Sequence, residues 1–242
     1  MDTIKINSEN VKMIAHRGLS DIERENTCPA FLAAANRSYF GIETDVHITA
    51  DSELVVIHDE TLKRVTNGAC EINVETSNYA DFKDVVLPDS DGSLARQDIR
   101  VPRLLEYIKI CKKYNKVCVL ELKNSFIRED IIRIIEQYKA LEYLDNVIFI
   151  SFFFDNCVCL REILNDAKIQ YLTDKPLTDE VVEKLLAYNL DLDIAYWHLT
   201  KEIVEDLHSK GIEVNCWTCN KKAVAEDLIE MGVDYITTNI LE

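Results

Sequence analysis

Short β-branched runs alternate along this chain with longer segments in which apolar residues recur at helical spacing. Nine runs are predicted strands: 12–16, 42–46, 54–58, 117–123, 147–151, 169–173, 192–196, 213–218 and 235–238. Helical periodicity occurs between most of them, over 28–38, 103–115, 128–141, 155–166, 179–188, 201–209 and 221–231. This alternation predicts parallel strands that are joined by crossover helices.

The spacing of the second and third predicted strands decides the architecture. Seven residues separate Val46 from Leu54, whereas a parallel crossover needs about a dozen. The run 54–58 should therefore return as an antiparallel hairpin arm, spanning about 47–58, which leaves eight parallel strands. We predict an α/β protein built on a closed (β/α)8 TIM barrel. No Ser/Gly/Pro-rich linker interrupts the sequence, so we expect a single domain over 1–242.

One face of the second predicted strand is polar where a buried strand should be apolar. Glu43, Asp45 and His47 occupy alternate positions and therefore share a face. Two carboxylates that are buried side by side need a cation, or at least one raised pKa. This pattern indicates a metal site or an acid/base pair. We place His47 outside the candidate set, either beside the site or in solvent.

Further candidate groups lie where neighbouring strands end. His16 ends the first strand, Glu121 and Lys123 end the third parallel strand, and the hairpin carries His58 back to the same rim. Catalytic groups of TIM barrels lie at this C-terminal rim. Taken alone, Glu121 and Lys123 would also fit a plain ion pair. The segment 67–101, rich in charged and turn residues, is predicted to be a small insertion over the rim.

The composition of the chain limits the kinds of partner and the cellular setting that we expect. Lys and Arg number 27 against 43 Asp and Glu, a formal net charge of −16, which argues against binding to nucleic acid or an anionic membrane surface. No apolar run is long enough for a transmembrane segment, and the opening residues lack the apolar region of a signal peptide. The eight cysteines form no zinc-spaced pairs, so we expect reduced thiols in a cytoplasmic protein. The oligomeric state is left open.

A set of motifs then resembles one family along essentially the whole chain. The motifs are "HRG" at 16–18, "ENT" at 25–27, "GIETDV" at 41–46, "VVIHDETLKRVTNG" at 55–68, "VPRLLE" at 101–106, "LELK" at 120–123, "ISF" at 150–152, "WTCN" at 217–220 and "GVDYITTN" at 232–239. In this order they look like the glycerophosphodiester phosphodiesterases. The resemblance implies metal-dependent hydrolysis of a small-molecule glycerophosphodiester to sn-glycerol-3-phosphate and an alcohol. The family favours Asp at the position where this chain has Asn239. No such difference from the family pattern removes a candidate metal ligand or catalytic histidine.

The resemblance also implies roles for individual residues. A divalent cation would bind Glu43, Asp45 and Glu121, and the all-oxygen ligand set selects Mg²⁺ or Ca²⁺, or else Mn²⁺. His16 and His58 would be the acid/base pair, and Arg17 and Lys123 would contact the phosphate. Trp217 would form an apolar wall for the glycerol. Core packing is an equal alternative for Trp217.

Two other functions stay open on the sequence alone. One is a lysophospholipase D-like activity on lysolipids, which would require an apolar patch near the mouth of the barrel. The other is a barrel that binds phosphorylated ligands without turnover, since a fold does not fix a function. A pure binder would need the cations and not an acid/base pair, so the presence of both His16 and His58 favours an enzyme.

Overall fold

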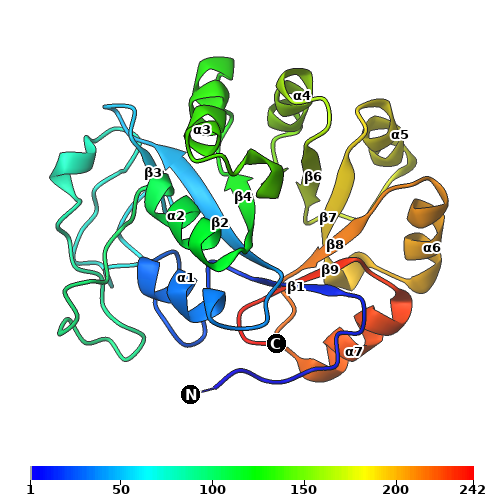
Figure 1. Ribbon diagram of the computed structural model, residues 1–242, viewed down its shortest axis with the longest axis horizontal. Coiled ribbons are helices and arrows are strands. Elements are labelled where there is room, and N and C mark those ends of the chain that lie inside the picture. The colour runs from blue at the N-terminus through cyan, green and yellow to red at the C-terminus, as the bar shows by residue number, and fades with distance from the viewer. Residues whose placement is uncertain (1) are drawn as a thin grey trace.

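The computed structural model describes residues 2–242 and forms a closed barrel of parallel strands surrounded by helices (Figure 1). The strands run in the order β1-β9-β8-β7-β6-β5-β4-β2-β3, and β1 also pairs with β2, which closes the barrel. The strand bounds are β1 Lys12–Ala15, β2 Gly41–Ile48, β3 Leu54–Val56, β4 Val117–Leu122, β5 Val147–Ser151, β6 Lys168–Thr173, β7 Asp191–Ala195, β8 Val214–Trp217 and β9 Tyr235–Thr238. The predicted TIM barrel is confirmed.

Seven α-helices and three 3₁₀ turns connect the strands in the described part of the chain. Their bounds are α1 Cys28–Ala35, α2 Leu104–Tyr114, α3 Arg128–Ala140, α4 Phe154–Ile163, α5 Asp179–Ala187, α6 Lys201–Ser209, α7 Lys222–Met231, η1 Tyr79–Asp81, η2 Leu144–Asn146 and η3 Tyr196–His198. Capping residues determine where several of these helices begin or end. The side chains of Thr27, Thr178 and Thr200 each accept a hydrogen bond from the first turn of the helix that follows. Asn115 and Gly232 end α2 and α7 in the left-handed conformation.

The predicted hairpin arm is present as β3, which pairs antiparallel with the end of β2. On its other side β2 pairs with β4, where Asp45 lies opposite Glu121. Side chains at Ile42 and Val46 belong to the core under the helices. Because strand side chains alternate, Glu43 and Asp45 face the barrel interior. Closing the barrel therefore brings the acidic face of β2 beside the inward face of β4.

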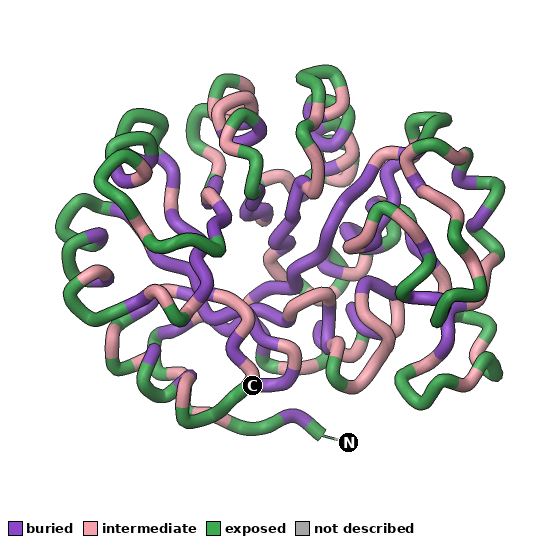
Figure 2. The backbone as a smooth tube through the Cα atoms, turned by 180° about the vertical axis from the view of Figure 1, so that it is seen from behind, coloured by how far each residue is buried: buried purple, intermediate pink, exposed green. Residues whose placement is uncertain are grey.

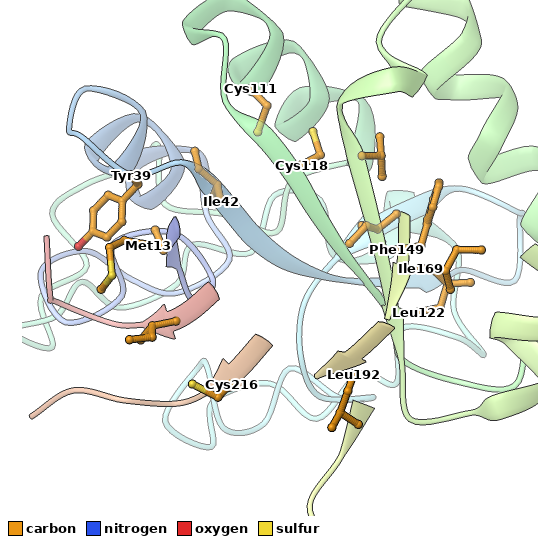
Figure 3. Close-up of a cluster of buried hydrophobic side chains, with 14 of the residues drawn as sticks. Met13, Tyr39, Ile42, Cys111, Cys118, Leu122, Phe149, Ile169, Leu192 and Cys216 are labelled. Atoms are coloured by element: carbon orange, nitrogen blue, oxygen red, sulfur yellow. The ribbon is translucent and has the colours of Figure 1, made fainter. Parts of the chain in front are cut away.

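The core has an outer layer between barrel and helices and a smaller layer inside the barrel. Buried strands lie at the centre and the exposed helix faces at the outside (Figure 2). In the outer layer, Cys111 of α2 points toward Cys118 of β4, and Phe149 and Ile169 follow on the next strands (Figure 3). The inner layer consists of six buried residues: Ile14, Val119, Ile148, Ile150, Leu172 and Tyr235.

The insertion between β3 and α2 has a hydrophobic core of its own, which its charged sequence did not predict. Tyr79, Phe82, Leu87 and Ile99 pack with the buried Val55 of β3. A backbone hydrogen bond from the Ala50 N–H to the Ser77 carbonyl oxygen joins the segment to the β2–β3 hairpin, and the segment lies beside this hairpin at the left in Figure 1. The insertion is thus a folded lobe, attached where β2 leaves the barrel.

All eight cysteines are free thiols in the structure. Five of them are buried: Cys111, Cys118, Cys157, Cys216 and Cys219. In residues 2–242 there is no helix of the length and apolarity that crossing a membrane requires.

Gly18 is expected to tolerate no side chain. Its φ is +78°, and a Cβ there would lie 2.7 Å from the backbone carbon of Ala30. Gly211 has nearly the same φ, +79°, but open space around the corresponding position. Gly211→Ala should cost about 1 kcal/mol through backbone strain alone, whereas Gly18→Ala adds overlap with α1 and should cost roughly 2 kcal/mol or more. Urea unfolding of both variants measures this difference, and equal costs would show that α1 yields freely.

Candidate active site

Three buried carboxylates meet at the C-terminal end of the barrel. Glu43 and Asp45 come from β2 and Glu121 from β4, and one oxygen of each lies within 4.8 Å of the others. Glu43 and Glu121 border a cavity of about 220 Å³, which His16, Arg17, His58 and Lys123 also line. The structure therefore brings together the two predicted histidines, the two predicted cations and the predicted carboxylates.

The pKa values of the three buried carboxylates are shifted in different directions. Burial, with Asp45 next, raises the pKa of Glu43 well above its usual range and that of Glu121 to about 8. Burial also opposes ionisation of Asp45, but Arg17 and Lys123 outweigh it and hold the pKa of Asp45 below its usual range. Without a cation, the cluster therefore holds one firmly ionised carboxylate and two that retain protons readily.

Two cationic side chains contact this cluster. Lys123 Nζ lies 2.9 Å from Glu121 Oε1 and 3.6 Å from Asp45 Oδ1. Arg17 Nε lies 3.5 Å from Asp45 Oδ2, while its Nη1 donates to Glu25 at 2.8 Å. With three ionised carboxylates, a bound dication and these two cations, the formal charge would be about +1. An anion can therefore bind at this position although the whole protein is acidic.

The backbone of the first loop also points into the site. Arg17 adopts a left-handed conformation, with φ of 54°, which costs a non-glycine residue free energy. In this conformation its N–H donates to Glu43 Oε2 at 2.8 Å. The strained residue thus fixes the orientation of one carboxylate while its own side chain reaches another.

His16 follows β1 and is held by the loops after β8 and β9. Its Nδ1 lies 2.8 Å from the amide oxygen of Asn239, and the Asn239 backbone N–H donates to the side chain of Asn220. Because an amide oxygen accepts, Nδ1 carries the proton in the neutral ring, and Nε2 is directed toward Glu43, 4.0 Å away. Burial and then Arg17 lower the pKa of His16 to about 4. At neutral pH the ring therefore presents an unprotonated Nε2.

His58 follows β3 and is held by a different network. Its Nδ1 lies 2.6 Å from Asp59, which accepts a hydrogen bond from Arg64 at 2.7 Å. Arg64 also donates twice to Glu25, the same carboxylate that binds Arg17. Burial lowers the pKa of His58, whereas the Asp59 carboxylate acts to raise it. One chain of ion pairs therefore connects the loop that carries His58 to the loop that carries His16.

His47 supports His58 from behind. It is 1% exposed, so of the two predicted positions it lies beside the site and not in solvent. Its Nε2 lies 3.2 Å from the backbone oxygen of His58, and its Nδ1 lies 2.7 Å from Glu75 of the insertion. Asn124, at the end of β4, also donates to Glu75. The polar face of β2 thus continues beyond the carboxylates as a support for the hairpin histidine.

Trp217 lines the cavity at the end of β8, so its position agrees with the predicted apolar wall. Its ring packs edge-on against Phe152, with centroids 5.6 Å apart, and against the exposed Trp197 at 6.3 Å. Ile150, Phe152 and Leu172 also line the apolar side of the cavity. The cavity therefore has a charged wall on β1, β2 and β4 and an apolar wall on β5, β6 and β8.

Sequence reasoning missed several residues at the site. Asn26 donates to Asp45 Oδ2 at 2.7 Å and thereby leaves Oδ1 for another ligand. Asp193 of β7 lines the cavity and is 1% exposed. The available signal for Asp193 was an acidic residue inside a strand, flanked by Leu192 and Ile194, the pattern that singled out β2. Arg24 donates to the carbonyl oxygens of Pro88 and Asp89 in the insertion.

The carboxylates fit a hard divalent cation. The ligand set is entirely oxygen, which suits Mg²⁺, Ca²⁺ and Mn²⁺. Glu121 Oε1 has Lys123 Nζ as its partner, whereas Asp45 Oδ1 is buried without a hydrogen-bond donor among the described residues. A buried carboxylate oxygen without a donor is costly unless a cation is close, so this cluster could bind a metal.

The fold and the site together define a class of protein: a TIM-barrel enzyme whose functional groups surround a cavity at the carboxyl ends of the strands. The sequence matches the model of the Glycerophosphoryl diester phosphodiesterase family over residues 16–242. A glycerophosphodiester phosphodiesterase of Caldanaerobacter subterraneus subsp. tengcongensis is 32% identical, covering 94% of this chain and 93% of its own length. The chain belongs to this family, as the motifs predicted.

Solved structures show the same fold. A glycerophosphodiester phosphodiesterase from Parabacteroides distasonis superimposes with a TM-score of 0.79 at 28% identity, covering 95% of this chain and 93% of the other. A phosphodiesterase from Oleispira antarctica, solved in complex with the product sn-glycerol-3-phosphate, gives a TM-score of 0.86 at 24% identity, covering 98% and 96%. The barrel is therefore shared with relatives of widely different sequence.

Glu121→Gln should stabilise the protein when divalent ions are removed. The pKa of Glu121 is about 8 in the folded chain against 4.5 ordinarily, so the folded state holds more protons between these values. Stability therefore falls as pH rises from about 4.5 through 8. At pH 8.5 in EDTA, the variant should melt roughly 2–4 °C above the wild type. Excess Mg²⁺ should then raise the melting temperature of the wild type and not of the variant.

Thermal unfolding followed by circular dichroism, at pH 5 and pH 8.5 with and without Mg²⁺, measures both effects. Glu226→Gln is the control, because Glu226 is exposed on α7 and should leave the melting temperature unchanged. A variant at Glu121 that melts below the wild type in EDTA would show that its carboxylate stabilises the site without a cation.

Proposed function

We propose that the protein hydrolyses glycerophosphodiesters to sn-glycerol-3-phosphate and an alcohol, using a divalent cation and histidine acid/base catalysis. The observation that carries the proposal is the pairing of His16 and His58 around one cavity, each with Nδ1 held by a partner. This arrangement lies within a family of that name, and a relative 32% identical bears it too. A pure phosphate binder would have no use for two oriented imidazoles.

The charged wall of the cavity would hold the phosphodiester. Glu43, Asp45 and Glu121 would bind the cation, which when present neutralises charge on the phosphoryl oxygens. Arg17 and Lys123 would contact the remaining phosphoryl oxygens, since both side chains are near the carboxylates and face the cavity. The substrate's negative charge is then met locally by cations although the net charge of the chain is −16.

The two histidines differ in a way that suggests their roles. His16 is neutral and presents a free Nε2, so it would accept the proton of the attacking hydroxyl. Burial lowers the pKa of His58 as well, but its Nδ1 contacts the Asp59 carboxylate, which stabilises the imidazolium when it forms, so His58 would donate a proton to the departing alcohol oxygen. One proton is taken and one is given, and the phosphorus–oxygen bond to the alcohol breaks as the new bond forms.

The attacking hydroxyl would belong to the substrate itself. The 2-hydroxyl of glycerol is adjacent to the ester and tethered at a high effective concentration, which favours it over water. Its attack would give a cyclic 1,2-phosphate and release the alcohol. Water would then open the ring, with the two histidines exchanging roles, and leave sn-glycerol-3-phosphate.

Chelation should abolish hydrolysis, and Mg²⁺, Ca²⁺ or Mn²⁺ should restore it, because three ionised carboxylates without a cation repel the phosphate. The assay is release of sn-glycerol-3-phosphate from the phosphocholine, phosphoethanolamine and phosphoglycerol diesters of glycerol. Lysolipids are included in the same panel. Full activity after exhaustive EDTA treatment would contradict the metal, and turnover confined to lysolipids would support the lysophospholipase D-like alternative.

Replacing either histidine should lower kcat by about 10²-fold or more while metal binding is retained. A substrate whose 2-hydroxyl is replaced by hydrogen tests the route. Under the cyclic mechanism this substrate should not be cleaved by the wild type. Should His16→Ala and His58→Ala both be inactive while the 2-deoxy substrate is cleaved normally, acid/base catalysis stands and direct attack by water replaces the cyclic route. His208→Ala, on the outer face of α6, is the control and should keep full activity.

A further inference from the structure

Asp193 is a buried acid to which the mechanism above assigns no role. It lies on β7, and its neighbours Leu192 and Ile194 belong to the core under the helices, so its side chain faces the barrel interior. It is 1% exposed, lines the cavity, and forms no side-chain hydrogen bond or ion pair with the described residues. A buried polar group without a partner destabilises the protein relative to one that is hydrogen-bonded. A ligand in the cavity can supply the missing partner.

The location of Asp193 indicates which part of a ligand it would meet. The charged groups lie on β1, β2 and β4, whereas β7 is separated from β4 by two strands and from β1 by the two others. Asp193 therefore lies across the barrel from the phosphate side. Ile150, Phe152, Leu172 and Trp217 are the apolar residues that line the cavity, and Thr218 and Thr237 line it too. A ligand group that fits here would combine carbon atoms, for the apolar side chains, with a hydrogen-bonding group for Asp193.

The terminal hydroxyl of glycerol has this chemistry. In a glycerophosphodiester the 2-hydroxyl is next to the ester, and the terminal hydroxyl is the glycerol oxygen furthest along the carbon chain from phosphorus. Burial, with Glu121 next, raises the pKa of Asp193 well above its usual range. A neutral carboxyl can donate to a hydroxyl and accept from it, but it offers little attraction to the ammonium group of an alcohol such as ethanolamine.

We infer that Asp193 binds the terminal hydroxyl of the glycerol moiety, so that the apolar side of the cavity receives glycerol and the alcohol to be released faces the open mouth. The inference rests on the proposed function and extends it to the choice of the group that is retained. A site that hydrogen-bonds a substrate hydroxyl rejects the analogue that lacks it, because the buried protein group is then left unpaired.

The test compares two substrates on three enzymes. The substrates are glycerophosphocholine and its analogue with hydrogen in place of the terminal hydroxyl, which keeps the 2-hydroxyl and the phosphocholine. The wild type should prefer the hydroxylated substrate by roughly tenfold or more in kcat/KM. Asp193→Asn retains a donor and an acceptor, so its preference should be within about threefold of the wild type. Asp193→Leu should show nearly equal kcat/KM for the two substrates.

Asp191→Asn is the matched control, since Asp191 lies two residues earlier on β7, outside the cavity, and accepts the Glu213 backbone N–H. It should leave the preference unchanged. The inference is overturned if the wild type does not discriminate, if Asp193→Leu discriminates as the wild type does, or if Asp193→Asn loses the preference. Should Asp193→Leu fail to fold, the wild type and Asp193→Asn still decide between these outcomes. A wild type inactive on every glycerophosphodiester would instead refute the proposed function.

Discussion

The repulsion among three buried carboxylates is the constraint on which the site depends. Glu43, Asp45 and Glu121 would not remain ionised together in a low-dielectric interior. Each surrounding group offsets part of that repulsion: Lys123 and Arg17 by charge, the Arg17 backbone N–H and Asn26 by hydrogen bonds. The repulsion that remains favours the binding of a cation at the three carboxylates. A bound cation would in turn favour the binding of an anion.

The barrel converts a sequence pattern into this arrangement. Alternation on β2 places Glu43 and Asp45 inward, and the β2–β4 register places Glu121 opposite Asp45. The short connection after β2 then returns the chain as β3, which delivers His58 to the rim that His16 reaches from β1. Residues from distant parts of the chain meet because parallel strands end at the same edge of the barrel.

Much of this could be predicted from the sequence, since period and spacing are local properties. All nine predicted strands occur, and the carboxylates of β2 were identifiable because an acidic residue stood where a core residue was expected. What could not be predicted depends on contacts between distant segments. The core of the insertion was hidden because its apolar residues are scattered among charged ones without a helical or strand period. Strand order and register bring Asn239 to His16 and place Asp193 in the cavity, and neither order nor register can be read from a single sequence.

The contact of His47 with Glu75 couples the insertion lobe to the site in a further respect. His58 is held from behind by His47, which is held by Glu75, and Glu75 belongs to a lobe with its own small core. Proteins open locally in cooperative units whose stabilities differ. Opening of the lobe would release the support of His58 while the barrel strands stayed paired. The temperature range in which the enzyme works would then be set by the stability of this lobe, and sequence changes within the lobe could adjust that range without altering the barrel.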